Sequence, residues 1–316
     1  MKPTRPITRA WCVELQQEIT IVTARREYFS QEPPRARFHF LCSSEHCRAL
    51  GVKVTGVSYD VKPQDNLGTR AAHYRVNPND AHCPDCEWIE EDATQAAVRH
   101  DETSEELAAR QARTALDDVI DVFEPEARAR REDTDVGSGT AEPASHRPSN
   151  PGRRERLTRT SDFERLVDYY RHARHLLPAE AFNALTLKVT GLGGVSLRSY
   201  FQHVRFARPG DNGRVIHGGG LVERYGTGFK FLFFDRIDGK RVSLYVSPER
   251  MKTYRSSRYL QELLSHANEV RFFTLYVLGS VSLSPSGKSV SIDTDDLRHL
   301  ALVLGPAKNQ QEPSVE

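Results

Sequence analysis

The sequence predicts an α+β protein with a zinc-ribbon-like N-terminal module and an oligonucleotide-binding (OB)-like β barrel in the C-terminal half. Two observations predict this division: four of the five cysteines form two close pairs in the first third of the chain, and strand-like segments dominate the last third. A helical and disordered acidic linker is expected between them. With 316 residues the chain has room for two domains of about 100–200 residues each. We assign the module to residues 10–91, the linker to 92–156, and the helical lead-in and barrel to 157–305.

The two cysteine pairs, in residues 42–47 and 83–86, are typical of a metal site. Thiolates are soft anionic ligands, and two turns that each supply two of them complete a closed tetrahedral zinc site. The expected zinc ligands are Cys42, Cys47, Cys83 and Cys86. His73 or His82 can replace one thiolate, and the sequence leaves this alternative open. Because a closed site has no open position for water, we expect a structural role for the zinc.

The order of features in this region resembles a known family. A β-rich stretch over 18–24 leads to Phe40-Leu41-Cys42, Ala72-His73-Tyr74 follows, and His82 precedes Cys83-Pro84-Asp85-Cys86. This order resembles the zinc-binding amino-terminal region of competence protein CoiA-like and related mobile-element proteins, over residues 10–90. The resemblance implies an association with DNA processing or mobile elements. The acidic motif of the nuclease-like domain that follows in those proteins is not found here, so the resemblance implies no activity.

The charge of the chain is unevenly distributed. The formal net charge is +1, but residues 90–135 carry a net charge of −9 and residues 185–305 a net charge of +7. Such asymmetry indicates a nucleic-acid surface, or two parts of one chain that attract each other. Within the acidic region, an Ala-, Glu- and Arg-rich pattern over 94–122 predicts a helix, and residues 124–156 predict a disordered linker.

The C-terminal half contains the order of elements expected of an OB barrel. Ser161 and Glu164 have capping-box spacing before an apolar periodic run, which predicts a helix ending near Leu177, and a second short helix is expected over 178–185. The expected strands are 186–190, 215–225, 228–234, 241–246, 270–283, 289–292 and 297–304. A helical pattern over 259–264 separates the third barrel strand from the fourth. Three strands, a helix and two strands is the order of an OB barrel.

Basic and aromatic residues of this half are candidates for nucleic-acid binding. OB barrels stack bases on aromatic side chains while Lys and Arg follow the backbone. The candidates are Arg198, Arg205, Arg208, Tyr225, Lys230, Arg241 and Tyr245. The alternating Phe229, Phe231 and Phe233 are expected to fill the barrel core, because phenylalanine is usually buried.

These observations predict a non-enzymatic protein that binds single-stranded DNA or RNA through phosphate neutralisation and base stacking. An alternative is a protein-interaction adaptor in a larger complex, whose acidic connector covers a basic face. A third interpretation is a metal-dependent nuclease using Asp235, Asp238 and Lys240, although Asp238-Gly239 is typical of a hairpin turn. There is no run of about 18 apolar residues and no secretory leader, so we expect a cytoplasmic protein without a membrane partner.

Overall fold

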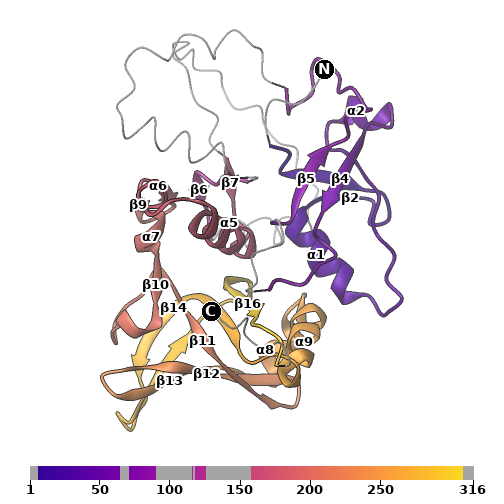
Figure 1. Cartoon of the computed structure of the whole chain (residues 1–316). Helices are drawn as coiled ribbons and strands as arrows, with labels where there is room; N and C mark the ends of the chain where they lie inside the picture. Colours follow the sequence, from indigo (N-terminus) through magenta and orange to yellow (C-terminus); the bar gives the residue numbers. More distant parts are fainter. Residues whose placement is uncertain (1–5, 65–70, 90–115, 117, 126–157, 309–316) are drawn as a thin grey trace, which may run out of the picture.

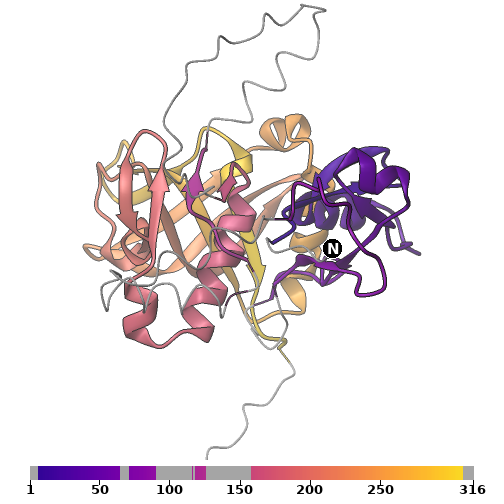
Figure 2. The same ribbon diagram turned by 90° about the horizontal axis from the view of Figure 1, so that it is seen from above.

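The computed structural model describes residues 6–64, 71–89, 116, 118–125 and 158–308. These residues form three β-sheets of five, four and seven strands, with helices packed around them (Figure 1). The N-terminal sheet and the C-terminal barrel form two lobes that lie side by side, as the view from above also shows (Figure 2). The mixed α and β content that the sequence predicts is confirmed.

The N-terminal lobe is an antiparallel sheet with the strand order β2-β1-β3-β4-β5. Its strands are β1 (Arg9–Cys12), β2 (Gln17–Thr20), β3 (Phe40–Cys42), β4 (Lys53–Val57) and β5 (His73–Val76). Helix α1 (Ile21–Ser30) follows β2 directly, because Thr20 caps it by accepting a hydrogen bond from the Thr23 amide. The stretch over 18–24 that the sequence marks as β-rich is therefore a strand only as far as Thr20. The zinc-ribbon-like assignment of this lobe stays a prediction.

A four-stranded sheet in the order β7-β6-β8-β9 leads into the C-terminal lobe. The elements of this part are β6 (Val122–Phe123), β7 (Arg159–Thr160), α5 (Phe163–Leu176), α6 (Ala179–Asn183), β8 (Thr186–Val189) and β9 (Gly193–Ser196). Helix α5 confirms the predicted helix. Its N-cap is Asp162, however, and the carboxylate of Glu164 binds two arginines of α1.

No helix among the described residues is both long and apolar enough to cross a membrane.

Five strands of the C-terminal half close into a barrel. They follow the order β11-β12-β13-β15-β14, and β14 pairs back with β11. Their bounds are β11 (Arg214–Tyr225), β12 (Gly228–Ile237), β13 (Lys240–Val246), β14 (Phe273–Leu283) and β15 (Ser289–Asp293). Only the β13–β15 pair in this barrel is parallel. Helices α8 (Pro248–Thr253) and α9 (Ser257–Ser265) come between the third and fourth barrel strands. Helix α9 confirms the helical pattern predicted over 259–264, whereas α8 was not predicted. Three shorter elements, α7 (Leu197–Tyr200), β10 (Phe201–His203) and β16 (Leu300–Leu304), complete the lobe.

The barrel core explains the phenylalanine alternation. Phe229, Phe231 and Phe233 are all buried, so the predicted core role is confirmed. Gly220 on β11 faces β12 so closely that a Cβ atom would lie 2.2 Å from the carbonyl oxygen of Leu232. A glycine is therefore required where these two strands meet.

The two lobes are joined by a buried network of ion pairs. Arg25 and Arg26 of α1 bind Asp162, Glu164 and Asp168, which lie at the start of α5 and along it, with N–O distances of 2.9–3.1 Å. All five side chains are buried. The three carboxylates neutralise the two guanidinium charges in a region shielded from water. Removal of one partner would therefore leave a buried charge without compensation.

Most of the predicted acidic linker lies outside the described residues. Its described part includes β6, which pairs in parallel with both β7 and β8. The helix expected over 94–122 lies outside the described residues except at its end, where β6 begins.

Candidate functional site

Four side chains of the N-terminal lobe converge on one buried point: Cys42, Cys47, His82 and Cys86, which we call the Cys3His cluster. Their potential ligand atoms all lie within 4.8 Å of one another. Cys42 ends β3, Cys47 belongs to the short helix α2 (Glu45–Ala49), and the other two lie in the loop after β5. The convergence of two distant cysteine-bearing turns, which the spacing predicts, is confirmed.

The distances within the cluster match those of a four-coordinate metal site. Cys42 Sγ lies 3.7 Å from Cys86 Sγ, and His82 Nδ1 lies 3.4 Å from the same sulfur. Metal bonds of about 2.3 Å to sulfur and about 2.0–2.1 Å to nitrogen give tetrahedral edges of roughly 3.8 and 3.5 Å. A disulfide would need about 2.05 Å, and all five cysteines are free. The cluster could therefore hold a metal ion.

The pKa values of the cysteine thiols in the cluster are consistent with a site that binds a cation. Burial raises the pKa of the Cys42 and Cys86 thiols. Burial acts in the same direction on Cys47, but the Cys83 amide, 3.2 Å from its sulfur, and the neighbouring thiols together lower the pKa of Cys47. A bound divalent ion would compensate several buried thiolates at once.

Cys83, the predicted fourth ligand, lies beside the cluster but outside the four-atom group. Its backbone amide donates to Cys47 Sγ, and its own side chain is half-buried. His82 takes this place in the group, which is the alternative that the sequence left open. His73 donates from Nδ1 to the Ala71 carbonyl, 2.8 Å away, and is not in the group. The geometry thus favours three cysteines and His82 over four cysteines.

A groove of about 520 Å³ crosses the outer face of the barrel between the loops that follow β11 and β14. Three of the predicted nucleic-acid-binding residues line it: Tyr225, Lys230 and Tyr245. The two tyrosines are 47% and 48% exposed, and their ring centroids lie 6.3 Å apart in an edge-to-face arrangement. We call this the β12–β13 groove.

Strand register places these side chains together. Lys230 of β12 lies directly opposite Tyr245 of β13, and the residues beside each of them point into the core. Ser243, Ser291 and Ser282 form a row across β13, β15 and β14, and all three line the groove. The sequence analysis missed this row, although each serine occupies an outward position on a predicted strand.

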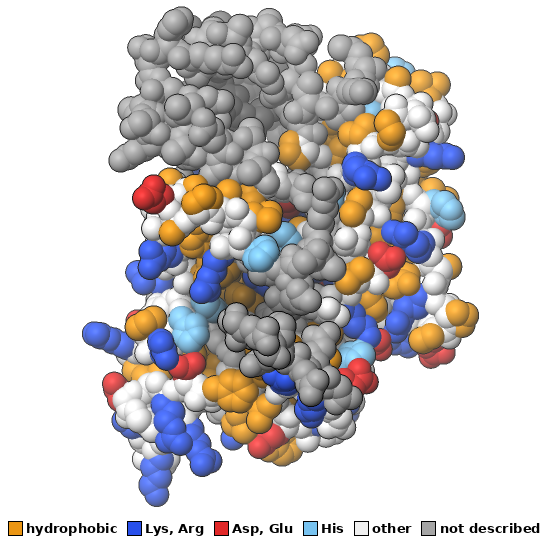
Figure 3. All heavy atoms as spheres, in the orientation of Figure 1, with side chains coloured by type: hydrophobic (Ala, Val, Ile, Leu, Met, Phe, Trp, Pro, Cys, Tyr) orange, Lys and Arg blue, Asp and Glu red, His pale blue; other side chains and the backbone are white. Residues whose placement is uncertain are grey.

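The other four predicted nucleic-acid-binding residues do not line the groove. Arg241 is exposed on β13, on the same outward face as Ser243 and two residues before it. Arg198 donates to Asn183 Oδ1 (3.0 Å), Arg205 pairs with Asp235 (3.3 Å), and Arg208 is exposed. Figure 3 shows Lys and Arg side chains gathered on the lower left of this face, over the barrel lobe. These arginines therefore flank the barrel and do not belong to the groove itself.

The carboxylates considered for a nuclease lie in other settings. Asp238 and Gly239 have positive φ angles of 48° and 74° and make the two-residue turn between β12 and β13. Asp235 pairs with Arg205. Among the residues that the structure describes, the Cys3His cluster is the one group of three or more His, Cys, Asp or Glu side chains close enough to share a metal ion.

Known proteins offer no further identification of these sites. Comparisons of the chain with models of protein families, with curated proteins and with solved structures find no match.

Proposed function

We propose that the protein binds single-stranded nucleic acid in the β12–β13 groove, and that a zinc ion in the Cys3His cluster stabilises the N-terminal lobe. The barrel has the strand order 1-2-3-5-4 with a helical insertion between strands 3 and 4, which fits an OB-type barrel. OB barrels bind oligonucleotides on the face of their second and third strands, between the loops after strands 1 and 4. The groove occupies this position, and the analogy of fold supports the proposal.

The exposed tyrosine pair is the observation that carries the proposal. Tyr225 and Tyr245 expose their rings on the outer face of the barrel, where they do not contribute to the packing of the core. Stacking of a base on such a ring contributes about 1–3 kcal/mol and is tolerant of sequence. The groove therefore supplies stacking surfaces for one or two bases.

Charge around the groove supports contacts with phosphate. Lys230 lines the groove, Arg241 extends the same outward face of β13, and Arg198 and Arg208 are exposed on the lead-in. Serine hydroxyls between the tyrosines and these cations can donate to phosphate or to base edges. Because Lys230 and the carboxylate of Asp293 both line the groove, its local field is weak, and stacking is the larger contribution.

Zinc is the metal that this ligand set favours. Three thiolates and one imidazole in a buried four-donor arrangement are typical of a structural zinc site, whereas calcium and magnesium prefer oxygen ligands. A structural role for zinc agrees with four protein donors, which fill a tetrahedral coordination. From the resemblance to CoiA-like proteins we also propose that this lobe acts in DNA processing or on mobile elements.

Fluorescence anisotropy with labelled single-stranded and double-stranded oligonucleotides of DNA and RNA tests the function. We expect binding to single strands, and a loss of about tenfold or more in affinity for Tyr245→Ala, because one stacking surface is removed. Phe206→Ala is the matched control, since Phe206 is a 68% exposed aromatic residue of the same lobe outside the groove. No binding by the wild-type protein at low salt would contradict the proposal and favour the adaptor alternative.

A further inference from the structure

One carboxylate lines the β12–β13 groove and has no part in base stacking or in phosphate contacts. Asp293 ends β15, is exposed, and belongs to the lining of the groove. Its carboxylate has no hydrogen bond or ion pair with any residue that the structure describes. Glu223, which lies opposite Lys230, is by contrast engaged by the Tyr225 hydroxyl, which donates to it at 2.9 Å. Asp293 can therefore accept hydrogen bonds from a ligand in the groove.

Strand register places Asp293 beside the ring of Tyr245. Strands β13 and β15 run parallel, and their paired residues Leu244 and Ile292 are buried. Tyr245 and Asp293 each follow this pair by one residue, so both point outward on adjacent strands about 4.8 Å apart. Lys230 lies opposite Tyr245 on the other side, on β12. The ring therefore has a cation on one side and a carboxylate on the other.

This order of charges orients a nucleotide in the groove. Lys230 attracts a phosphate, whereas Asp293 repels it from two strand spacings away, about 10 Å. The phosphates are therefore expected on the β12 side of Tyr245. The edge of a base stacked on this ring then faces β15 and its carboxylate.

We propose that Asp293 makes the groove selective for guanine, an inference that rests on the proposed binding of single strands. A carboxylate accepts hydrogen bonds and does not donate them, so it distinguishes bases by their donors. Guanine presents two adjacent donors, N1–H and the N2 amino group, to which the two carboxylate oxygens can bind together.

The other bases match this carboxylate less well. Cytosine and adenine offer one amino group next to a ring nitrogen that is itself an acceptor. Thymine and uracil offer one N–H between two carbonyl oxygens, which a carboxylate repels. Unpaired single strands expose these edges, so the carboxylate can read them directly. Guanine is therefore the base that Asp293 binds best.

Fluorescence anisotropy with short oligothymidine strands that differ in one central base tests the selectivity. The central base is thymine, cytosine, adenine, guanine, or hypoxanthine, which lacks the N2 amino group of guanine. We expect the wild-type protein to bind the guanine strand about tenfold more tightly than the thymine strand, as for one bidentate base contact. The hypoxanthine strand should fall between them. The same series in oligouridine extends the test to RNA.

The variant Asp293→Asn tests the residue itself. The amide keeps the size of the carboxylate but places a donor against one of the two guanine donors, so the preference should fall below about twofold. The thymine strand should bind at least as tightly as it does to wild type, because a negative charge is removed. Asp295→Asn is the matched control, since Asp295 is an exposed aspartate outside the groove, two residues further along. It should keep the wild-type preference.

The outcomes separate this inference from the proposed function. Equal affinity for the guanine and thymine strands, or a guanine preference that Asp293→Asn retains, would overturn the selectivity and leave the binding of single strands in place. No binding of any strand by the wild-type protein would overturn both.

Discussion

The Cys3His cluster and the β12–β13 groove differ in what holds their side chains in place. The cluster gathers three buried cysteines and one buried histidine, and burial disfavours the thiolate form of the cysteines unless a cation joins them. The groove residues are exposed on strands whose opposite face is filled by buried phenylalanines. We therefore expect the first site to need a bound cation in order to be stable, whereas the barrel core preforms the second.

Metal removal gives the largest expected difference between the two regions. Binding of structural zinc supplies about 10–16 kcal/mol in zinc-finger peptides, so a chelator should unfold the N-terminal lobe while the barrel keeps its structure. Circular dichroism and amide exchange, measured with and without chelator, would show this. Equal protection of both lobes after metal loss would contradict the account.

The metal content of single variants identifies the fourth ligand. Cys86→Ser and His82→Ala should each lose the metal, because both side chains belong to the Cys3His cluster. Cys83→Ser should retain one metal ion per chain, since Cys83 lies outside the group. Mass-spectrometric metal analysis of the purified variants decides between them. Metal loss in Cys83→Ser with retention in His82→Ala would restore the four-cysteine set.

Breaking the buried network between the lobes is the next largest effect. Glu164→Ala removes the carboxylate that binds Arg25, Arg26 and the Tyr259 hydroxyl. It should lower the free energy of unfolding by about 3–5 kcal/mol, because two guanidinium groups stay buried with fewer partners. Glu124→Ala, at the exposed pair with Arg159, should cost less than about 1 kcal/mol in the same urea titration. Similar costs for the two variants would show that the lobes are not joined in this way.

A smaller effect is expected from pH. Burial, with contributions from His203 and Arg174, lowers the pKa of His217 from 6.5 to about 3. Below pH 6.5 the unfolded chain binds a proton at this residue that the folded chain does not bind, so stability falls as the pH falls toward 3. The loss attributable to His217 at pH 5 is about 2 kcal/mol. Urea unfolding of wild type and His217→Gln at pH 7 and pH 5 measures it, and an identical pH dependence in both would refute this assignment.

The smallest effect concerns salt. Lys230 is the only lysine or arginine that lines the groove, among the residues that the structure describes. Lys230→Gln should reduce the slope of log K against log salt concentration by about 1, as expected for one lost phosphate contact. Lys252→Gln, on the exposed surface of α8, is the control. An unchanged slope in Lys230→Gln would place the phosphate contacts elsewhere.

The sequence predicted the barrel well because alternation and turn chemistry determine it locally. Phe229, Phe231 and Phe233 mark one buried face, and Asp238-Gly239 marks the turn. Cysteine spacing likewise predicted the convergence of two turns, although spacing alone could not choose between Cys83 and His82.

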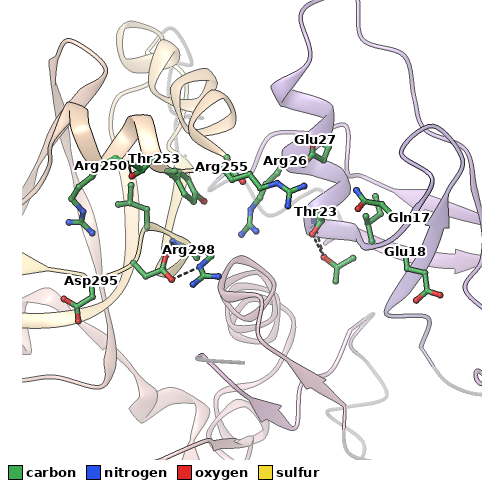
Figure 4. Close-up of a pocket in the computed structure, with 16 residues that line it drawn as sticks. Gln17, Glu18, Thr23, Arg26, Glu27, Arg250, Thr253, Arg255, Asp295 and Arg298 are labelled. Atoms are coloured by element: carbon green, nitrogen blue, oxygen red, sulfur yellow. Dashed lines mark hydrogen bonds and ion pairs between the residues drawn. The ribbon is translucent and has the colours of Figure 1, made fainter. Parts of the chain in front are cut away.

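The parts that the sequence did not reveal depend on tertiary contacts. The sequence marked residues 18–24 as β-rich, so the helix that presents Arg25 and Arg26 to α5 was not predicted. Glu164 was interpreted as part of a capping box, and this local pattern does not indicate that its carboxylate binds Arg25 and Arg26. A cavity between β2 and α1 on one side and residues 250, 253–256 and 295–298 on the other brings together segments far apart in the chain (Figure 4), and no local sequence pattern predicts it.

Photo-crosslinking tests the central claim most directly. A single-stranded oligonucleotide that carries 5-iodouracil is irradiated with the zinc-loaded protein, and the attached peptides are identified by mass spectrometry. The account predicts attachment at Tyr225 and Tyr245, whose rings are exposed in the groove. Attachment confined to residues outside the groove, or none under conditions of measurable binding, would contradict it.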